Sequence, residues 1–135
     1  MNKKIIKIRV RYGETDQMGI VHHSNYAQYF ELTRIRWLEN LGASYKKMEE
    51  EGIMLPVYEM KIKYKKPAFF DEIITVETSL EKIPTAKIVL NYVVRNSSKE
   101  ILTQAQTTLV FTDAKTKKPM RCPEYILKLL NSEEK

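Results

Sequence analysis

The feature that most constrains this chain is one long stretch of helical periodicity, from Tyr26 to Leu41. Apolar residues on this stretch cover one arc at 100° per residue, as expected for a helix that packs against another layer. Leu32 and Ile35 lie beyond that arc, which predicts a helix buried on more than one side. The arc itself contains Tyr26, Ala27, Phe30, Trp37, Leu38 and Leu41.

Residues suited to helix ends flank this stretch. Asn25 is a good N-cap with Gln28 three residues later, the spacing of a capping box, and Gly42 is a good C-terminal stop. Residues 44–52 predict a second, short helix that Ser44 caps.

Most of the remaining chain alternates between apolar and polar residues with a period of two, the pattern of half-buried strands. In the first strand, Ile6, Ile8, Val10 and Tyr12 share a face. Polar turns of hairpin length join the last strands, so the sheet should be mostly antiparallel. The strands are expected at 4–12, 57–65, 73–81, 87–95 and 101–112, with a final short helix near Pro123. The sequence therefore predicts the α+β class, with one domain over residues 1–135 in which an antiparallel sheet wraps one long helix.

Composition limits the location and the partners of the chain. It has 135 residues and one cysteine, and no apolar run is long enough to span a membrane. Lys7 and Arg9 interrupt the apolar residues near the start, so no signal peptide is expected and a cytoplasmic location is favoured. The net charge of +6 is compatible with nucleic acid, acidic lipid or a phosphorylated small molecule, and equally with solubility alone.

The loop before the long helix carries the candidate chemistry. Asp16 is either a turn residue, like most loop aspartates, or a carboxylate beside a helix N-terminus that serves as nucleophile or general base. His22 and His23 are adjacent, which is not the spacing of a metal pair, and no other ligand cluster completes a site. Unpaired N–H groups at the helix N-terminus could stabilise a negatively charged oxygen. A carboxylate and an oxyanion donor together describe acyl transfer to water.

Charged residues on the helix have a less specific interpretation. Arg34 falls inside the apolar arc and Glu31 at its edge, so a partly buried ion pair is the favoured reading. The alternative is that one of them faces a site across a subunit interface.

The stretch YGETDQMGIVHHSNYAQYFELTR, residues 12–34, resembles the hotdog-fold acyl-CoA thioesterases of the 4-hydroxybenzoyl-CoA thioesterase type. Within that group it is most similar to the Tol-Pal-associated thioesterases. The resemblance continues through LPVYEMKIKYKKPAFFDEI and TDAKTKKPMRCP. It implies an antiparallel sheet around a central helix, homodimers that often pair into homotetramers, and active sites at the dimer interface. No cofactor and no metal are expected.

The same resemblance implies roles for single residues. The catalytic aspartate falls on Asp16, and the backbone N–H that polarises the thioester carbonyl falls on His23. The family's acid in the following turns of the helix falls on Glu31. The chain departs from many relatives at His22, where they carry an aromatic residue, and at Phe70, where they carry Tyr.

The substrate-binding residues expected beside this pair are His22, Asn25, Tyr26 and Glu31. Lys63 and Lys65, in the densest lysine cluster, are candidates for binding the CoA phosphates. Lysines that keep an exposed strand from pairing with other chains explain the cluster equally well.

The predicted function is therefore hydrolysis of acyl-CoA to a free acid and CoA. Three alternatives remain open: a thioesterase acting on acyl groups of acyl carrier protein, a non-enzymatic acyl-CoA-binding protein, and a hydratase on the same fold. No nucleic-acid partner is expected, because this fold leaves no room for an added DNA-binding module.

Overall fold

The fold, a computed structural model that describes residues 2–133, is built on one antiparallel sheet of five strands in the order β1-β4-β5-β6-β3. Two short strands, β2 and β7, pair separately. The strands are β1 (Lys4–Arg9), β2 (Ile53–Met54), β3 (Val57–Tyr64), β4 (Ile73–Leu80), β5 (Lys87–Arg95), β6 (Ile101–Val110) and β7 (Thr112–Asp113). The helices are α1 (Asn25–Leu41), α2 (Tyr45–Glu50) and α3 (Glu124–Glu133), with a 3-10 turn η1 (Tyr12–Glu14).

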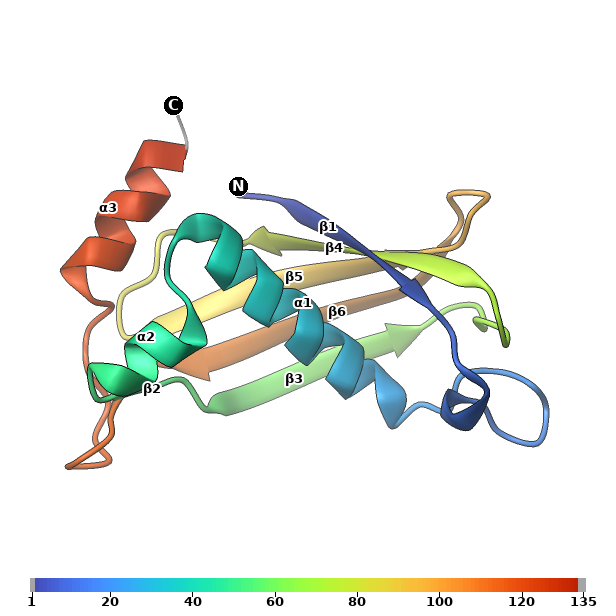
Figure 1. Cartoon of the computed structure of the whole chain (residues 1–135), viewed down its shortest axis with the longest axis horizontal. Coiled ribbons are helices and arrows are strands. Elements are labelled where there is room, and N and C mark those ends of the chain that lie inside the picture. The colour runs from blue at the N-terminus through green and yellow to red at the C-terminus, as the bar shows by residue number, and fades with distance from the viewer. Residues whose placement is uncertain (1, 134–135) are drawn as a thin grey trace.

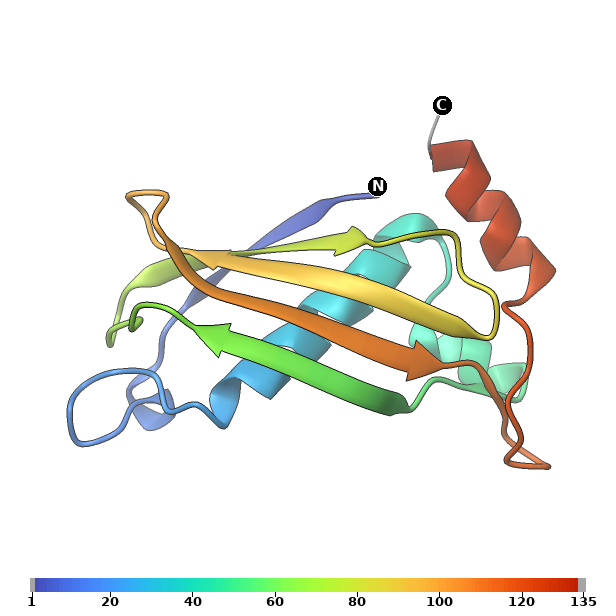
Figure 2. The ribbon, with the colours of Figure 1, turned by 180° about the vertical axis from the view of Figure 1, so that it is seen from behind.

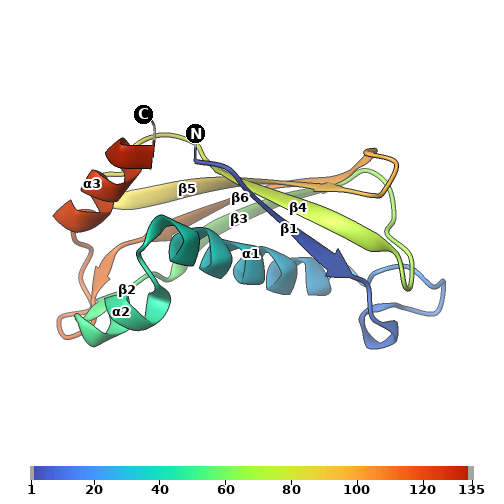
Figure 3. The same ribbon diagram turned by 45° about the horizontal axis from the view of Figure 1, so that its top comes forward.

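Helix α1 lies across one face of the sheet, and the sheet curves over it (Figures 1 and 3). Viewed from behind, the sheet lies in front of α1 (Figure 2). The core fills the space between them: Phe30 of α1 is fully buried, and its ring lies 4.6 Å from that of Tyr92 on β5. The predicted α+β hotdog architecture, an antiparallel sheet around one long helix, is thereby confirmed.

The ends of the helices agree with the sequence in two places and differ in one. Gly42 ends α1 with a φ of 103°, and its N–H donates to the carbonyls of Leu38 and Glu39. The Ser44 hydroxyl caps α2 by accepting from the Lys47 N–H. Both ends were predicted.

The predicted N-cap and capping box at Asn25 and Gln28 are wrong. Asn25 is the first helical residue, and its side-chain amide donates to the Glu14 carbonyl instead of accepting from the helix. Ser24 occupies the cap position, but its side chain accepts no capping hydrogen bond.

The face that α1 buries is narrower than predicted. Leu32 is 40% exposed and Ile35 is only partly buried. The rest of the chain therefore covers one side of the helix, whereas the sequence predicted burial on more than one side. Ala27 is exposed, whereas Tyr29 and Thr33 are buried in its place. A helix that crosses a single sheet contacts it along one stripe, which explains the difference.

The expected ion pair between Glu31 and Arg34 is absent from residues 2–133. Arg34 is buried at 4% exposure, and its Nε donates to the Tyr45 hydroxyl at 3.0 Å. Glu31 lies on the solvent side of α1. Arg34 therefore links α1 to α2 by a hydrogen bond to a neutral group.

Two strand predictions also need correction. Tyr12 does not share a buried face with Val10, because the Arg11 N–H donates to the Glu14 carboxylate and closes η1, leaving Tyr12 77% exposed. The expected strand 101–112 is divided into β6 and β7. Its alternation also shifts at Ile101, where the pairing with Arg95 is irregular.

Candidate active site

Asp16 sits at the start of a tight turn in the loop between η1 and α1. Its Oδ1 accepts from the Met18 N–H at 2.8 Å, and its carbonyl accepts from the Gly19 N–H at 3.0 Å. Gly19 has a φ of 77°, a conformation that favours glycine. Asp16 therefore forms a turn, as one of the two interpretations predicted. The turn uses only Oδ1, and Oδ2 accepts no hydrogen bond from the described part of the chain.

The chain enters α1 through a second turn, at His22–Ser24. The N–H groups of Asn25 and Tyr26 donate to the carbonyls of His22 and His23, at 3.0 and 3.3 Å. Within residues 2–133, the backbone N–H of His23 donates no hydrogen bond. It lies just before the N-terminus of a 17-residue helix, where the macrodipole favours negative charge.

One pocket of about 340 Å³ brings these two turns together with the end of β3. Its walls combine a carboxylate, lysines, aromatic rings and aliphatic side chains. The lining residues are Asp16, Ile20, Val21, His23, Tyr26, Tyr64, Lys65, Lys66 and Pro67. Four residues predicted from the sequence, Asp16, His23, Tyr26 and Lys65, thus line one cavity.

Two tyrosines form the aromatic wall of this pocket. The Tyr26 and Tyr64 rings are T-shaped with centroids 5.3 Å apart. Tyr26 is 3% exposed, and this burial raises the pKa of its phenol. Tyr64 was missed as a pocket residue, although strand alternation places it on the helix-facing side with Met60 and Ile62.

The lysine candidates are divided between two faces of the sheet. Alternation predicts Lys61, Lys63 and Lys65 on one face, but the N–H groups of Lys65 and Lys66 both donate to the Leu102 carbonyl. This irregularity ends the alternation and brings Lys65 to the pocket. Lys63 lies with Lys61 in a shallow depression beside Gln104 of β6.

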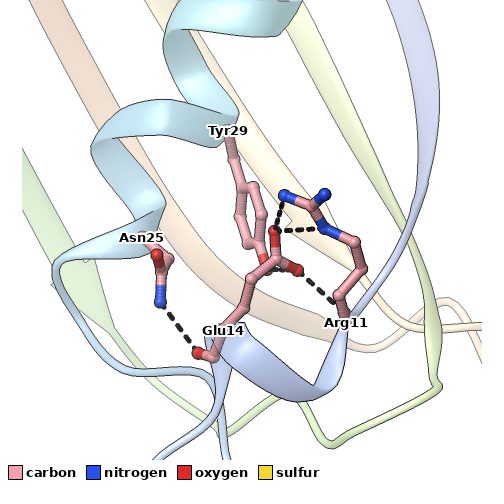
Figure 4. A network of polar contacts seen from close by, with 4 residues as sticks. All are labelled: Arg11, Glu14, Asn25 and Tyr29. Carbon is pink, nitrogen blue, oxygen red and sulfur yellow. Dashed lines mark hydrogen bonds and ion pairs between the residues drawn. The ribbon is translucent and has the colours of Figure 1, made fainter.

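A polar network missed by the sequence analysis holds η1 against α1 (Figure 4). The Glu14 carboxylate accepts from the Arg11 N–H at 2.8 Å, from the Tyr29 hydroxyl at 3.0 Å and from the Arg11 guanidinium. The Glu14 carbonyl accepts from the Asn25 amide and the His22 N–H, at 2.8 and 2.9 Å. Glu14 therefore ties the loop that carries Asp16 to the first turn of α1.

Three other predicted substrate-binding residues lie outside the pocket. The exposed His22 ring stacks on that of His23, with centroids 4.2 Å apart. Asn25 lines a groove beside Glu14, and Glu31 lines a larger groove between β1 and α1.

No three His, Cys, Asp or Glu side chains between residues 2 and 133 are grouped to bind a metal ion. None of the helices described has the length and apolar character needed to cross a membrane.

Comparison with known sequences places the chain in a family. Residues 10–130 match the thioesterase-like superfamily. A Bacillus subtilis (strain 168) protein named putative acyl-CoA thioesterase YneP is 37% identical over 115 residues, which cover 85% of this chain and 83% of that protein. The acyl-CoA thioester hydrolase YbgC of Escherichia coli O6:H1 is 26% identical over 120 residues, which cover 89% and 90%.

Solved structures agree in fold. A DHNA-CoA thioesterase from Staphylococcus aureus superposes with a TM-score of 0.88 at 36% identity, covering 100% of this chain and 97% of that one. A 4-hydroxybenzoyl-CoA thioesterase mutant in complex with 4-hydroxybenzoyl-CoA shares the fold, with a TM-score of 0.87 at 17% identity, and the match covers 96% and 99% of the two chains. The chain therefore belongs to the thioesterase-like superfamily and has its hotdog fold.

Proposed function

We propose that this chain is a thioester hydrolase that cleaves acyl-CoA into a free acid and CoA. The observation that carries the proposal is the pocket lined by both Asp16 and His23, whose backbone N–H donates no hydrogen bond within residues 2–133. Relatives named as acyl-CoA thioesterases support the same reaction class.

In the proposed reaction the thioester carbonyl oxygen accepts from the His23 N–H, and the dipole of α1 stabilises its developing negative charge. Asp16 acts in one of two ways. It attacks the carbonyl carbon to give a mixed anhydride, which water then hydrolyses, or it removes a proton from an attacking water. In the first route CoA leaves as the thiolate, which takes a proton from solvent. In the second route it takes the proton that Asp16 removed from the water.

The other side chains that line the pocket support binding of an acyl-CoA there. The Tyr26 and Tyr64 rings offer an apolar surface for the acyl group. Lys65, exposed at the rim, can attract the CoA phosphates, whereas Lys66 is already paired with Glu100. Lys63, Asn25 and Glu31 lie outside this cavity, so the proposal assigns them no contact with substrate bound to the same subunit.

The proposal includes a homodimer formed through β3. This strand is at one edge of the sheet and pairs only with β6 in the described chain. An exposed edge with large apolar side chains, here Val57, Tyr58 and Tyr64, favours pairing with a second copy. Light scattering on the purified protein tests this, and a mass of one chain would contradict it.

Asp16→Asn tests the catalytic role. The amide oxygen can still accept from the Met18 N–H, so the turn should survive, but the side chain can no longer act as base or nucleophile. Loss of a general base typically lowers turnover about 10²–10⁴-fold. Asp71→Asn is the matched control, because Asp71 is an exposed loop carboxylate whose one side-chain partner within residues 2–133 is Arg9, and we expect it to leave turnover unchanged.

Release of free thiol from aromatic, short-chain and long-chain acyl-CoA measures the activity, with an acyl carrier protein donor in parallel. Near-normal hydrolysis by Asp16→Asn would contradict the assignment. A clear preference for the carrier-protein donor would favour that alternative, and binding without turnover would favour a non-enzymatic acyl-CoA-binding protein.

A further inference from the structure

The His22 imidazole is bonded to the turn that leads into α1. Its Nδ1 lies 3.2 Å from the Ser24 backbone nitrogen and 2.8 Å from the Ser24 hydroxyl oxygen. A backbone N–H can only donate, so Nδ1 must be the acceptor in this contact. With Nδ1 accepting from the Ser24 N–H, the ring is in the tautomer that carries its proton on Nε2.

The backbone of His22 is held as well. Its N–H donates to the Glu14 carbonyl at 2.9 Å, and its carbonyl accepts from the Asn25 N–H at 3.0 Å. Together with the ring, these contacts fix the residue directly before His23. Among the described residues, the one N–H of this turn without an acceptor is that of His23, and His23 lines the pocket.

We propose that the neutral His22 side chain is a positioning group. Its Nδ1 accepts a hydrogen bond from the Ser24 N–H, and this bond holds the turn that presents the His23 N–H to the pocket. The inference rests on the proposed function, because it assigns the His23 N–H to the thioester oxygen. It changes the expected role of His22: the ring acts through the backbone instead of contacting the substrate.

A side-chain atom three bonds from Cα that accepts from the N–H two residues later makes the contact of an Asx turn. Asparagine places its Oδ1 where histidine places Nδ1. Glutamine carries its oxygen one carbon further out, and alanine has no acceptor. Three substitutions at one position therefore separate hydrogen-bond acceptance from ring shape.

The test compares His22→Ala, His22→Asn and His22→Gln by acyl-CoA hydrolysis, with circular dichroism to verify folding. Misplacement of a catalytic group by about 1 Å can cost about 100-fold, so we expect His22→Ala to lower kcat about 10- to 100-fold with little change in KM. His22→Asn should recover most of the lost kcat, whereas His22→Gln should not. Equal kcat in all three variants, or a loss confined to KM, would overturn the inference.

A further readout separates this inference from the proposed function. Nitrogen-15 NMR of the imidazoles at neutral pH should show His22 protonated on Nε2, whether or not any thioester is hydrolysed. A proton on Nδ1 would contradict the positioning role.

Discussion

Replacing Tyr29 by Phe removes one hydroxyl from the contact that holds η1 against α1. That hydroxyl donates to the Glu14 carboxylate at 3.0 Å, Tyr29 is 4% exposed, and the Glu14 side chain is 12% exposed. Burial raises the pKa of Tyr29, and the bond to Glu14 raises it further. Burial also acts to raise the pKa of Glu14, but hydrogen bonds from Arg11 and Tyr29 outweigh it and hold that pKa below its ordinary value.

The structure indicates the size of the effect. A hydrogen bond to a charged group contributes about 1.5–3 kcal/mol to stability, and the upper part of that range applies when the charge is left without a partner. In Tyr29→Phe the Glu14 oxygen keeps its bond from the Arg11 N–H at 2.8 Å. We therefore expect the free energy of unfolding to fall by about 1.5 kcal/mol, close to a tenfold change in the ratio of folded to unfolded protein.

Urea unfolding at pH 7 measures the loss, with all proteins at one concentration because association would add to apparent stability. The Glu14 pKa is depressed in the fold, so the contribution of its carboxylate is present above the unfolded pKa and is lost as the pH falls through the folded one. The difference between wild type and Tyr29→Phe should therefore shrink below about pH 4. Tyr12→Phe is the matched control, since Tyr12 is 77% exposed. Equal stability of Tyr29→Phe and wild type, or an equal loss in both variants, would refute the reasoning.

Three further predictions concern the helix ends and the single thiol. Gly42→Ala should lower the free energy of unfolding by about 1–2 kcal/mol, because an L-residue is strained at a φ of 103°. Gly13→Ala, with nothing near the added methyl group and no positive φ, should cost less than half as much in the same urea titration. Ser44→Ala should lose about 1 kcal/mol with its cap, and an unchanged unfolding midpoint would contradict that role. Burial raises the pKa of Cys122 to about 12, so the folded protein should react with a thiol reagent at pH 8 far more slowly than the urea-unfolded chain.

Part of the candidate site could be predicted because it depends on local sequence. The Asp16 turn needs only an aspartate and a glycine at the right spacing, and the helix after it follows from periodicity. The resemblance added the pairing of Asp16 with the His23 N–H. The structure brings these two residues into one pocket with Tyr26 and Lys65.

Other parts of the site depend on contacts between distant segments. Lys65 reaches the pocket because its N–H and that of Lys66 both donate to the Leu102 carbonyl on β6. No pattern within β3 reveals this contact. The expected partner of Arg34 was Glu31 on the same helix, but packing of α2 brings Tyr45 to it instead.

The sequence by itself determined the long helix and the five main strands, the antiparallel sheet around that helix, and the ends of α1 and α2 at Gly42 and Ser44. These features follow from periodicity and backbone preference, which act over a few residues. The tertiary structure alone decided which face of α1 is covered and how Glu14 joins the Asp16 loop to the helix. Those outcomes depend on which donors and acceptors meet once the chain has folded, and spacing along the chain does not encode such meetings.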